Sequence, residues 1–322
     1  MLLGKNRPLK LGIVVPCYNE EEALSATIQR LLGVLKNLEE ERLISINSFI
    51  YLVDDGSIDS TFEIIQEFNK KTKQVKCLKF TRNFGNQSAL LAGLLGVRKL
   101  DVDCAITIDA DLQQDENLIK DFILKYKEGY EIVFGVRKTY KIKNPLKKLT
   151  SHMFYKTMGF LGAKIIPNHS EYRLTGRRAL DALSEFKEYD LFLRSVFTEM
   201  GFKTTTISYN TKARMAGVTK FNFASLMRLA INGITSFSIV PLRLVAILGI
   251  ILTLISFGVG IEVIWEKLYL KNTIPGWTTL VVCVCFFSGI QIFCLGIISE
   301  YLGQIFREVK SRPRYIEEVE LL

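Results

Sequence analysis

The sequence predicts an α/β protein, in which a mostly parallel β-sheet flanked by helices is followed by helices in the membrane. Three features of the 322-residue chain lead to this class. Short apolar runs alternate with segments of helical periodicity, acidic residues end three of those runs, and two nearly uncharged stretches of about 20 residues lie near the C-terminus. Alternating strands and helices are typical of parallel sheets.

The expected elements follow one another in regular order along the N-terminal part. We expect strands at 11–20, 49–57, 75–81, 104–110 and 131–137, and helices at 23–40, 60–71, 87–100 and 116–129. After about residue 140 the alternation weakens, although residues 173–186 have helical periodicity and residues 203–210 the pattern of a strand. Because ligands of open α/β sheets bind beyond the carboxyl ends of the strands, the loops there are the first candidates for a site.

The C-terminal third is expected to contain two membrane spans, at 244–265 and 277–298. Basic residues flank the pair: residues 203–243 hold six of them and no acid, and Arg307, Lys310, Arg312 and Arg314 follow the second span. Such an excess marks the cytoplasmic side, so we expect both termini in the cytoplasm of an integral inner- or cell-membrane protein. We divide the chain into a cytoplasmic domain (1–220), an interfacial amphipathic helix (221–241), a two-helix transmembrane hairpin (242–306) and a cytoplasmic tail (307–322).

The composition argues against several other classes. The net charge of +9 is concentrated beside the apolar stretches, which favours anionic lipid headgroups over nucleic acid as the partner. Six cysteines without a CxxC pair indicate buried thiols in a reducing compartment, and two histidines give little support to a zinc site or a Ser-His-Asp triad. The N-terminus has no long apolar core, so we expect no signal peptide.

The segment AITIDADLQQDE, residues 105–116, places two acids one residue apart directly after an apolar run. Side chains alternate along an extended chain, so Asp109, Asp111 and Gln113 are expected on one side. Two carboxylates and an amide oxygen suit Mg²⁺ or Mn²⁺, whose remaining positions substrate phosphates would fill. The alternative is a solvated turn in which the acids make local hydrogen bonds.

A second acidic segment, VDDGSIDST, ends the run that begins at residue 49. A carboxylate of Asp54 or Asp55 can accept a hydrogen bond from a ring N–H of a nucleotide base, and Gly56 permits a tight turn. The alternative is a strand-to-helix turn, in which Asp59 or Ser60 caps the next helix. Both interpretations can hold for different residues of the segment.

Together these motifs resemble a known family. In chain order they read VVPCYNE, LVDDGSIDST, TRNFGNQSALLAG, DADLQQDE, RLTGRRAL, RMAGVTKF and EYLGQIFREVKSRPRY. With the two spans they resemble the GT-A-fold, family 2 polyprenyl-phosphate glycosyltransferases, which include dolichol-phosphate mannose synthases and bacterial undecaprenyl-phosphate glucosyltransferases. The resemblance covers nearly the whole chain.

The resemblance implies roles for individual residues. Asp109, Asp111 and Gln113 match the metal-binding segment, with Asp109 also close to the nucleotide sugar. The other nucleotide-contacting positions are Pro16, Tyr18, Glu20 and Asp54 or Asp55. Basic positions that handle phosphates are Arg137, Arg214 and Lys220.

Glu171, in the segment HSEYRL, stands where the family commonly has Asp. Its extra methylene moves the carboxylate by about 1.5 Å, the length of one C–C bond. The resemblance therefore implies a catalytic site of Asp111, Glu171, Arg214 and Lys220, with the role of Glu171 as base or as acceptor-positioning group left open.

The reaction implied is an inverting, metal-dependent transfer of a hexose to undecaprenyl or another polyprenyl phosphate at the cytoplasmic membrane face. Glucose from UDP-glucose is the expected donor sugar; mannose from GDP-mannose and a modified aminosugar are the alternatives. A processive polysaccharide synthase is a further alternative, but two spans are few for a polymer pore and a QxxRW motif is absent from the sequence. A binding protein without turnover is disfavoured by the retention of both Asp109 and Asp111. Tetramers occur in the family, which is compatible with a homo-oligomer.

Overall fold

The computed structural model describes residues 7–111, 113–138, 169–189, 191, 193–211 and 276–322, with scattered residues between 242 and 269. The chain divides into two compact units. The larger unit combines the N-terminal α/β part with residues 312–322, and the smaller one includes the long helix α10 (Trp277–Val309).

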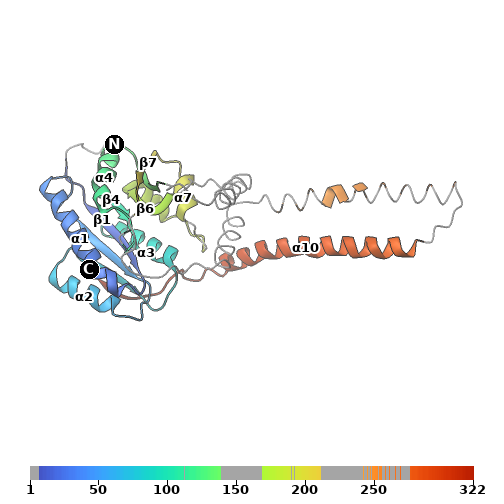
Figure 1. Cartoon of the computed structure of the whole chain (residues 1–322), viewed down its shortest axis with the longest axis horizontal. Helices are drawn as coiled ribbons and strands as arrows, with labels where there is room; N and C mark the ends of the chain where they lie inside the picture. The colour runs from blue at the N-terminus through green and yellow to red at the C-terminus, as the bar shows by residue number, and fades with distance from the viewer. Residues whose placement is uncertain are drawn as a thin grey trace. The chain divides into compact units, whose positions relative to one another are not determined.

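The larger unit is built on one eight-stranded sheet in the order β7-β5-β6-β4-β1-β2-β3-β8. Figure 1 labels β1, β4, β6 and β7 of this sheet. The strands are β1 (Leu11–Cys17), β2 (Phe49–Asp54), β3 (Val75–Phe80), β4 (Cys104–Thr107), β5 (Ile132–Arg137), β6 (His169–Gly176), β7 (Thr204–Tyr209) and β8 (Glu317–Leu321). Strands β4, β1, β2 and β3 run parallel to one another, as does the pair β5 and β7. The expected α/β sheet is confirmed, and its strands β2 and β4 are buried along their whole length.

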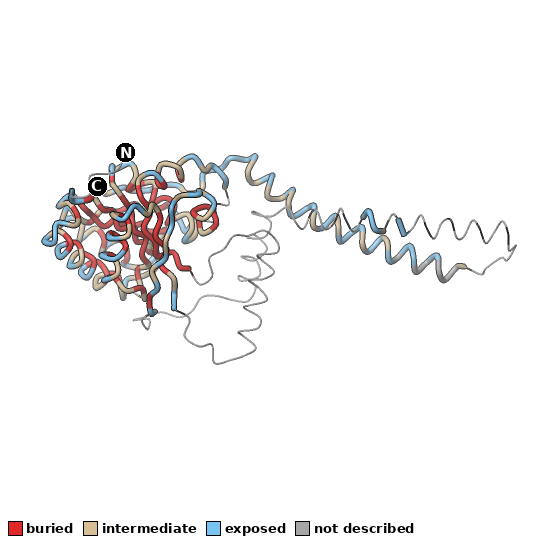
Figure 2. Tube along the Cα trace, turned by 90° about the horizontal axis from the view of Figure 1, so that it is seen from above, coloured by how far each residue is buried: buried red, intermediate tan, exposed pale blue. Residues whose placement is uncertain are grey.

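Helices cover both faces of the sheet, which explains why its central strands read as continuous apolar runs. The helices are α1 (Glu21–Glu40), α2 (Thr61–Lys71), α3 (Asn86–Lys99), α4 (Ile119–Lys127) after a 3-10 turn (Glu116–Leu118), α6 (Arg177–Leu183) and α7 (Leu193–Glu199). One core cluster joins α1, α2 and α4 to the sheet, for example through Ile28, Ile65 and Phe122. The second joins α3, α6 and α7, for example through Leu90 and Leu180. The buried residues form the interior of this unit in Figure 2.

The prediction of one helix over residues 173–186 is wrong in its first part. Residues up to Gly176 belong to β6, and α6 begins at Arg177. The reason is tertiary: β6 pairs antiparallel with β4 on one side and β5 on the other, with Arg173 opposite Thr107 and Phe134. Two ladders of hydrogen bonds outweigh a local helical periodicity.

Residues 307–322, which we expected as a tail, contribute the strand β8. It pairs antiparallel with β3 and is fastened by side chains as well. The ring of Tyr315 stacks on that of Phe80 with 4.9 Å between centroids, and Lys79 Nζ lies 3.1 Å from an oxygen of Glu318. The end of the chain therefore forms an edge of the sheet.

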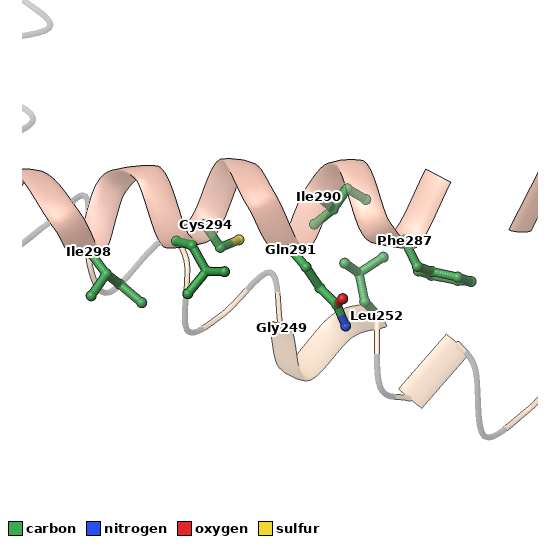
Figure 3. Close-up of a pocket in the computed structure, with 8 residues that line it drawn as sticks. Gly249, Leu252, Phe287, Ile290, Gln291, Cys294 and Ile298 are labelled. Carbon is green, nitrogen blue, oxygen red and sulfur yellow. The ribbon is translucent and has the colours of Figure 1, made fainter. Parts of the chain in front are cut away.

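In the smaller unit, α10 covers the second expected span and continues to Val309. Within the described residues, its segment Phe286–Val309 is the one stretch long and apolar enough to cross a membrane. Leu252 faces Phe287 and Gln291 of α10 across an apolar cavity of about 660 Å³ (Figure 3). Half of the residues of the first expected span and the whole interfacial helix 221–241 lie outside the described residues.

Candidate active site at the carboxyl ends of the strands

The acidic segments meet at one edge of the sheet because β1, β2 and β4 are parallel neighbours. Cys17, the last residue of β1, is in register with Asp54, the last residue of β2. On the other side of β1, Val14 is in register with Thr107, after which the chain continues to Asp109. The sheet thus brings together the loops that begin at Tyr18, Asp55 and Ile108.

The loop that carries Asp109 and Asp111 is held in shape by a buried glutamine. Gln114 accepts from the backbone N–H of Asp109 at 2.8 Å and donates to Asp109 Oδ2 at 2.5 Å. The backbone N–H of Gln113 donates to Asp111 Oδ1 at 3.1 Å, and Thr27 of α1 donates to the Ala110 carbonyl at 2.6 Å. Sequence reasoning missed Gln114, since nothing in its local pattern distinguishes it from its neighbour Gln113.

Negative charge accumulates around Asp109. Burial, followed by the proximity of Asp111 and Glu171, raises the pKa of Asp109 to about 6. A divalent cation at this point would offset the repulsion between these carboxylates, so the residues fit Mg²⁺ or Mn²⁺. In the part of the chain that the structure describes, no three His, Cys, Asp or Glu side chains form a metal site by themselves. Asp109, Asp111 and Gln113 therefore remain the proposed ligands, with phosphate oxygens to complete the set.

The two neighbours Asp54 and Asp55 have different environments. Both oxygens of Asp55 accept from the next loop, from the backbone N–H of Phe84 at 2.6 Å and of Gly85 at 2.8 Å. Asp54 accepts from Ser57 through Oδ1, whereas its buried Oδ2 has no hydrogen-bond partner. Burial raises the pKa of both carboxyl groups. Asp55 thus organises a loop, and Asp54 keeps an acceptor atom unused.

The turn after β2 needs glycine, as expected. Gly56 has a φ of +67°, and a Cβ at this position would lie 2.3 Å from the backbone carbonyl carbon of Arg82. Ser60 occupies the N-cap position of α2 without a side-chain capping bond, and the carboxylate of Asp59, one residue earlier, accepts from the backbone N–H of Thr61 at 3.0 Å and of Glu21 at 3.3 Å. One segment therefore both shapes the edge of the site and starts a helix.

The loop after β1 is tied to the turn after β2. The backbone N–H of Asn19 donates to Ser57 Oγ at 3.0 Å, and that of Glu20 donates to Thr61 Oγ1 at 2.9 Å. Pro16, Tyr18 and Glu20 are all partly exposed at this edge. Their expected contact with a nucleotide is thus sterically open.

Strand β6 brings Glu171 to the same edge. β6 runs antiparallel to β4 with Arg173 in register with Thr107, and the charge of Glu171, two residues before Arg173, raises the pKa of Asp109. Arg137, at the end of β5, is exposed, and its Nε donates to the Tyr209 hydroxyl at 3.3 Å. Its charge acts on both Asp109 and Asp111. Arg214 and Lys220 lie outside the described residues.

Two further residues at the site escaped the sequence analysis, Gln87 and Arg194. Both contact the carboxylate of Glu171, at 3.1 Å and 2.7 Å. Neither belongs to a local pattern of acids or bases, so only the folded chain reveals them.

The parallel strand core with this polar edge is a GT-A fold, the fold of nucleotide-sugar-dependent glycosyltransferases. The chain belongs to glycosyl transferase family 2, whose family model matches residues 12–199. A second family model, described as the GtrB C-terminal hairpin, matches residues 240–305. The expected family, fold class and enzyme class are confirmed.

Full-length relatives agree with this membership. The uncharacterized glycosyltransferase YkoT of Bacillus subtilis is 44% identical over 97% of this chain and 92% of that protein. The SfII prophage-derived bactoprenol glucosyl transferase of Shigella flexneri is 35% identical over 96% of this chain and 97% of that protein. The prophage bactoprenol glucosyl transferase homolog of Escherichia coli K12 is also 35% identical, over 96% and 98%.

Proposed function

We propose that this protein transfers glucose from UDP-glucose to a polyprenyl phosphate at the cytoplasmic face of the membrane, with inversion at the anomeric carbon. The observation that carries the proposal is the similarity, over nearly the entire chain, to proteins named bactoprenol glucosyl transferase. The geometry supports it, because the edge of the sheet combines acidic groups for a cation with arginines for phosphate. Mannose from GDP-mannose and an aminosugar remain alternative donors.

The donor nucleotide would lie over the ends of β1 and β2. Asp54 or Asp55 is proposed to accept from a base N–H, and Pro16, Tyr18 and Glu20 line the neighbouring loop. Both carboxylates are buried at the end of β2, and Asp55 also holds the loop at Phe84 and Gly85 in place.

The diphosphate would lie over the end of β4. Asp109, Asp111 and Gln113 would hold Mg²⁺ or Mn²⁺, which when bound acts as a Lewis acid on the departing diphosphate. Arg137 adds a fixed positive charge to the same edge, and Arg214 and Lys220 are proposed to do so as well. Fixed cations stabilise the charge that develops on the leaving group.

The acceptor phosphate is already an oxyanion at neutral pH, so its attack needs positioning more than a strong general base. A long polyprenyl chain stays in the bilayer, which makes the basic residues of 203–243 and the apolar helices suitable neighbours of the lipid. Both termini and the α/β unit are proposed to be cytoplasmic, in a protein of the inner or cell membrane.

The test mixes the purified protein with Mg²⁺ or Mn²⁺, undecaprenyl phosphate and a panel of radiolabelled nucleotide sugars. Label that moves into the organic phase with UDP-glucose supports the proposal. Label from another donor corrects the sugar, insoluble polymer identifies a processive synthase, and nucleotide binding without transfer excludes the enzyme.

A further inference from the structure

Glu171 is a buried carboxylate held between two guanidinium groups. Its Oε2 accepts from Nη2 of Arg173, and its Oε1 accepts from Nε of Arg194 at 2.7 Å. Gln87 adds a third hydrogen bond, to Oε1 at 3.1 Å. Burial by itself would raise the pKa of Glu171, but the charges of Arg173 and Arg194 outweigh it and lower that pKa. Glu171 is therefore ionised, with both oxygens occupied by donors.

Arg173 and Arg194 differ in their burial and in their other contacts. The side chain of Arg173 is fully buried, with its guanidinium 4.4 Å from the ring centroid of Phe197. The side chain of Arg194 is 37% exposed, and its charge acts on Asp109, as does that of Glu171. Arg173 thus holds Glu171 in the interior. Arg194 is the member of this Arg173–Glu171–Arg194 network that is exposed at the site.

The ion pair with Glu171 uses only the Nε atom of Arg194. Glu171 engages Nε, and among the described residues no acceptor contacts its Nη1 or Nη2. A guanidinium held at Nε has its two Nη groups oriented as a fork, which matches two oxygens of a phosphate. Glu171, Arg173 and Arg194 together carry one net positive charge, which suits an anion beside the acidic groups of the site.

We infer that Arg194 binds a phosphate oxyanion of a substrate and that Glu171 is a positioning residue, which orients Arg194 and does not remove a proton. The inference deepens the proposed function and rests on it. The ligand is a phosphate group, which belongs either to the diphosphate of the nucleotide sugar or to the polyprenyl phosphate. A base role for Glu171 is disfavoured because both its oxygens are engaged and the acceptor arrives as an anion.

The experiment compares wild type, Arg194→Gln, Glu171→Gln and the double variant as full-length proteins. Affinity for UDP and GDP is measured by titration calorimetry with Mn²⁺, and affinity for the lipid by binding to nanodiscs that contain undecaprenyl phosphate. Where transfer occurs, kcat and both KM values are determined as well. Arg98→Gln is the matched control, since Arg98 Nε also pairs with a carboxylate, Asp181, at 2.8 Å and its side chain is 34% exposed.

We expect Arg194→Gln to weaken one of the two ligands by about 10- to 100-fold, the worth of a charge-assisted hydrogen bond. Loss of nucleoside diphosphate affinity assigns the phosphate to the donor, and loss of lipid affinity assigns it to the acceptor. Glu171→Gln should weaken the same ligand. The double variant should bind no more weakly than Arg194→Gln alone, because Glu171 acts through Arg194. Arg98→Gln should leave both affinities unchanged.

Two safeguards keep the test decisive. Glu171→Gln leaves Arg173 buried without its partner, so Glu171→Asp, which keeps the charge and withdraws the carboxylate, replaces it if the first variant does not fold. Arg194→Lys should recover part of the affinity, because it keeps the charge and loses the fork.

The inference is overturned if Arg194→Gln binds both ligands like wild type, or if Glu171→Gln lowers kcat while both affinities and KM values stay unchanged. Effects that multiply in the double variant would also overturn it. A wild-type protein that labels no lipid would refute the proposed function instead, and the two binding measurements would still report on Arg194.

Discussion

The hydroxyl of Tyr51 donates a 2.7 Å hydrogen bond to Oε1 of Glu320, across 269 positions of the sequence. Tyr51 lies on β2 in the interior of the sheet, and Glu320 lies on β8 at its edge. The last residues of the chain are thus bound to the strand that ends in Asp54, one of the site acids.

Replacing Tyr51 by Phe should destabilise the α/β unit by about 1 kcal/mol, because Glu320 loses a charged hydrogen bond while the buried ring is kept. Unfolding of the detergent-solubilised protein, followed by circular dichroism, measures the change. Glu318→Gln is the comparison, since its pair with Lys79 is partly exposed and should contribute less than about 0.5 kcal/mol. Equal effects of the two variants would contradict the assignment.

Gly93 of α3 should tolerate no side chain. A Cβ there would lie 2.3 Å from Val14 Cγ1 and 3.0 Å from Val53 Cγ2, so Gly93→Ala should cost about 1–3 kcal/mol through overpacking between α3 and the sheet. Gly33 of α1 is the matched control, because it is exposed and a Cβ there meets nothing within 4 Å. Gly33→Ala should stabilise the helix by roughly 0.5–1 kcal/mol. Thermal unfolding of both variants measures these two opposite changes in stability.

The response to Mn²⁺ should depend on pH through Asp109. Its folded-state pKa of about 6 is raised, so the fold favours the protonated form, and stability without metal should fall as pH rises from about 4 through 6. Above that range the carboxylate is ionised and available to a cation. At pH 5.0 the carboxyl group of Asp109 is mostly protonated, so Mn²⁺ affinity should be several-fold lower than at pH 7.5.

Thermal-shift titrations with Mn²⁺ at the two pH values check this dependence. Asp109→Asn removes the titrating group and should abolish most of the pH difference. A wild-type Mn²⁺ response that is the same at both pH values would exclude Asp109 as the titrating ligand.

Asp111→Ala should abolish sugar transfer at saturating metal, with a loss of at least about a hundredfold in kcat, since one of two carboxylates that hold the cation is removed. Asp121→Ala, in the first turn of α4, is a control that removes an acid from a neighbouring helix. Transfer by Asp111→Ala at the wild-type rate would remove Asp111 from the site.

The part of the site that could be predicted lies in local patterns. Asp109 and Asp54 stand at the ends of apolar runs, and a run of that length and composition forms a strand whose end faces the ligand side of the sheet. Glu171 was assigned to the site only through the resemblance of its segment to a family motif. Arg194 was identified only from the structure, because its partner Glu171 is 23 residues away and on a different element.

The sequence by itself determined the alternation of strands and helices, the edge at which the acids gather and the apolar nature of α10, since each depends on the periodicity of neighbouring residues. The tertiary structure decided the rest. It placed β6 antiparallel between β4 and β5, which brings Glu171 close enough to Asp109 for its charge to raise the pKa of that residue, and it paired β8 with the edge strand β3. Strand pairing is a choice among partners distant in sequence, made by the packing of the whole sheet, and no local pattern contains it.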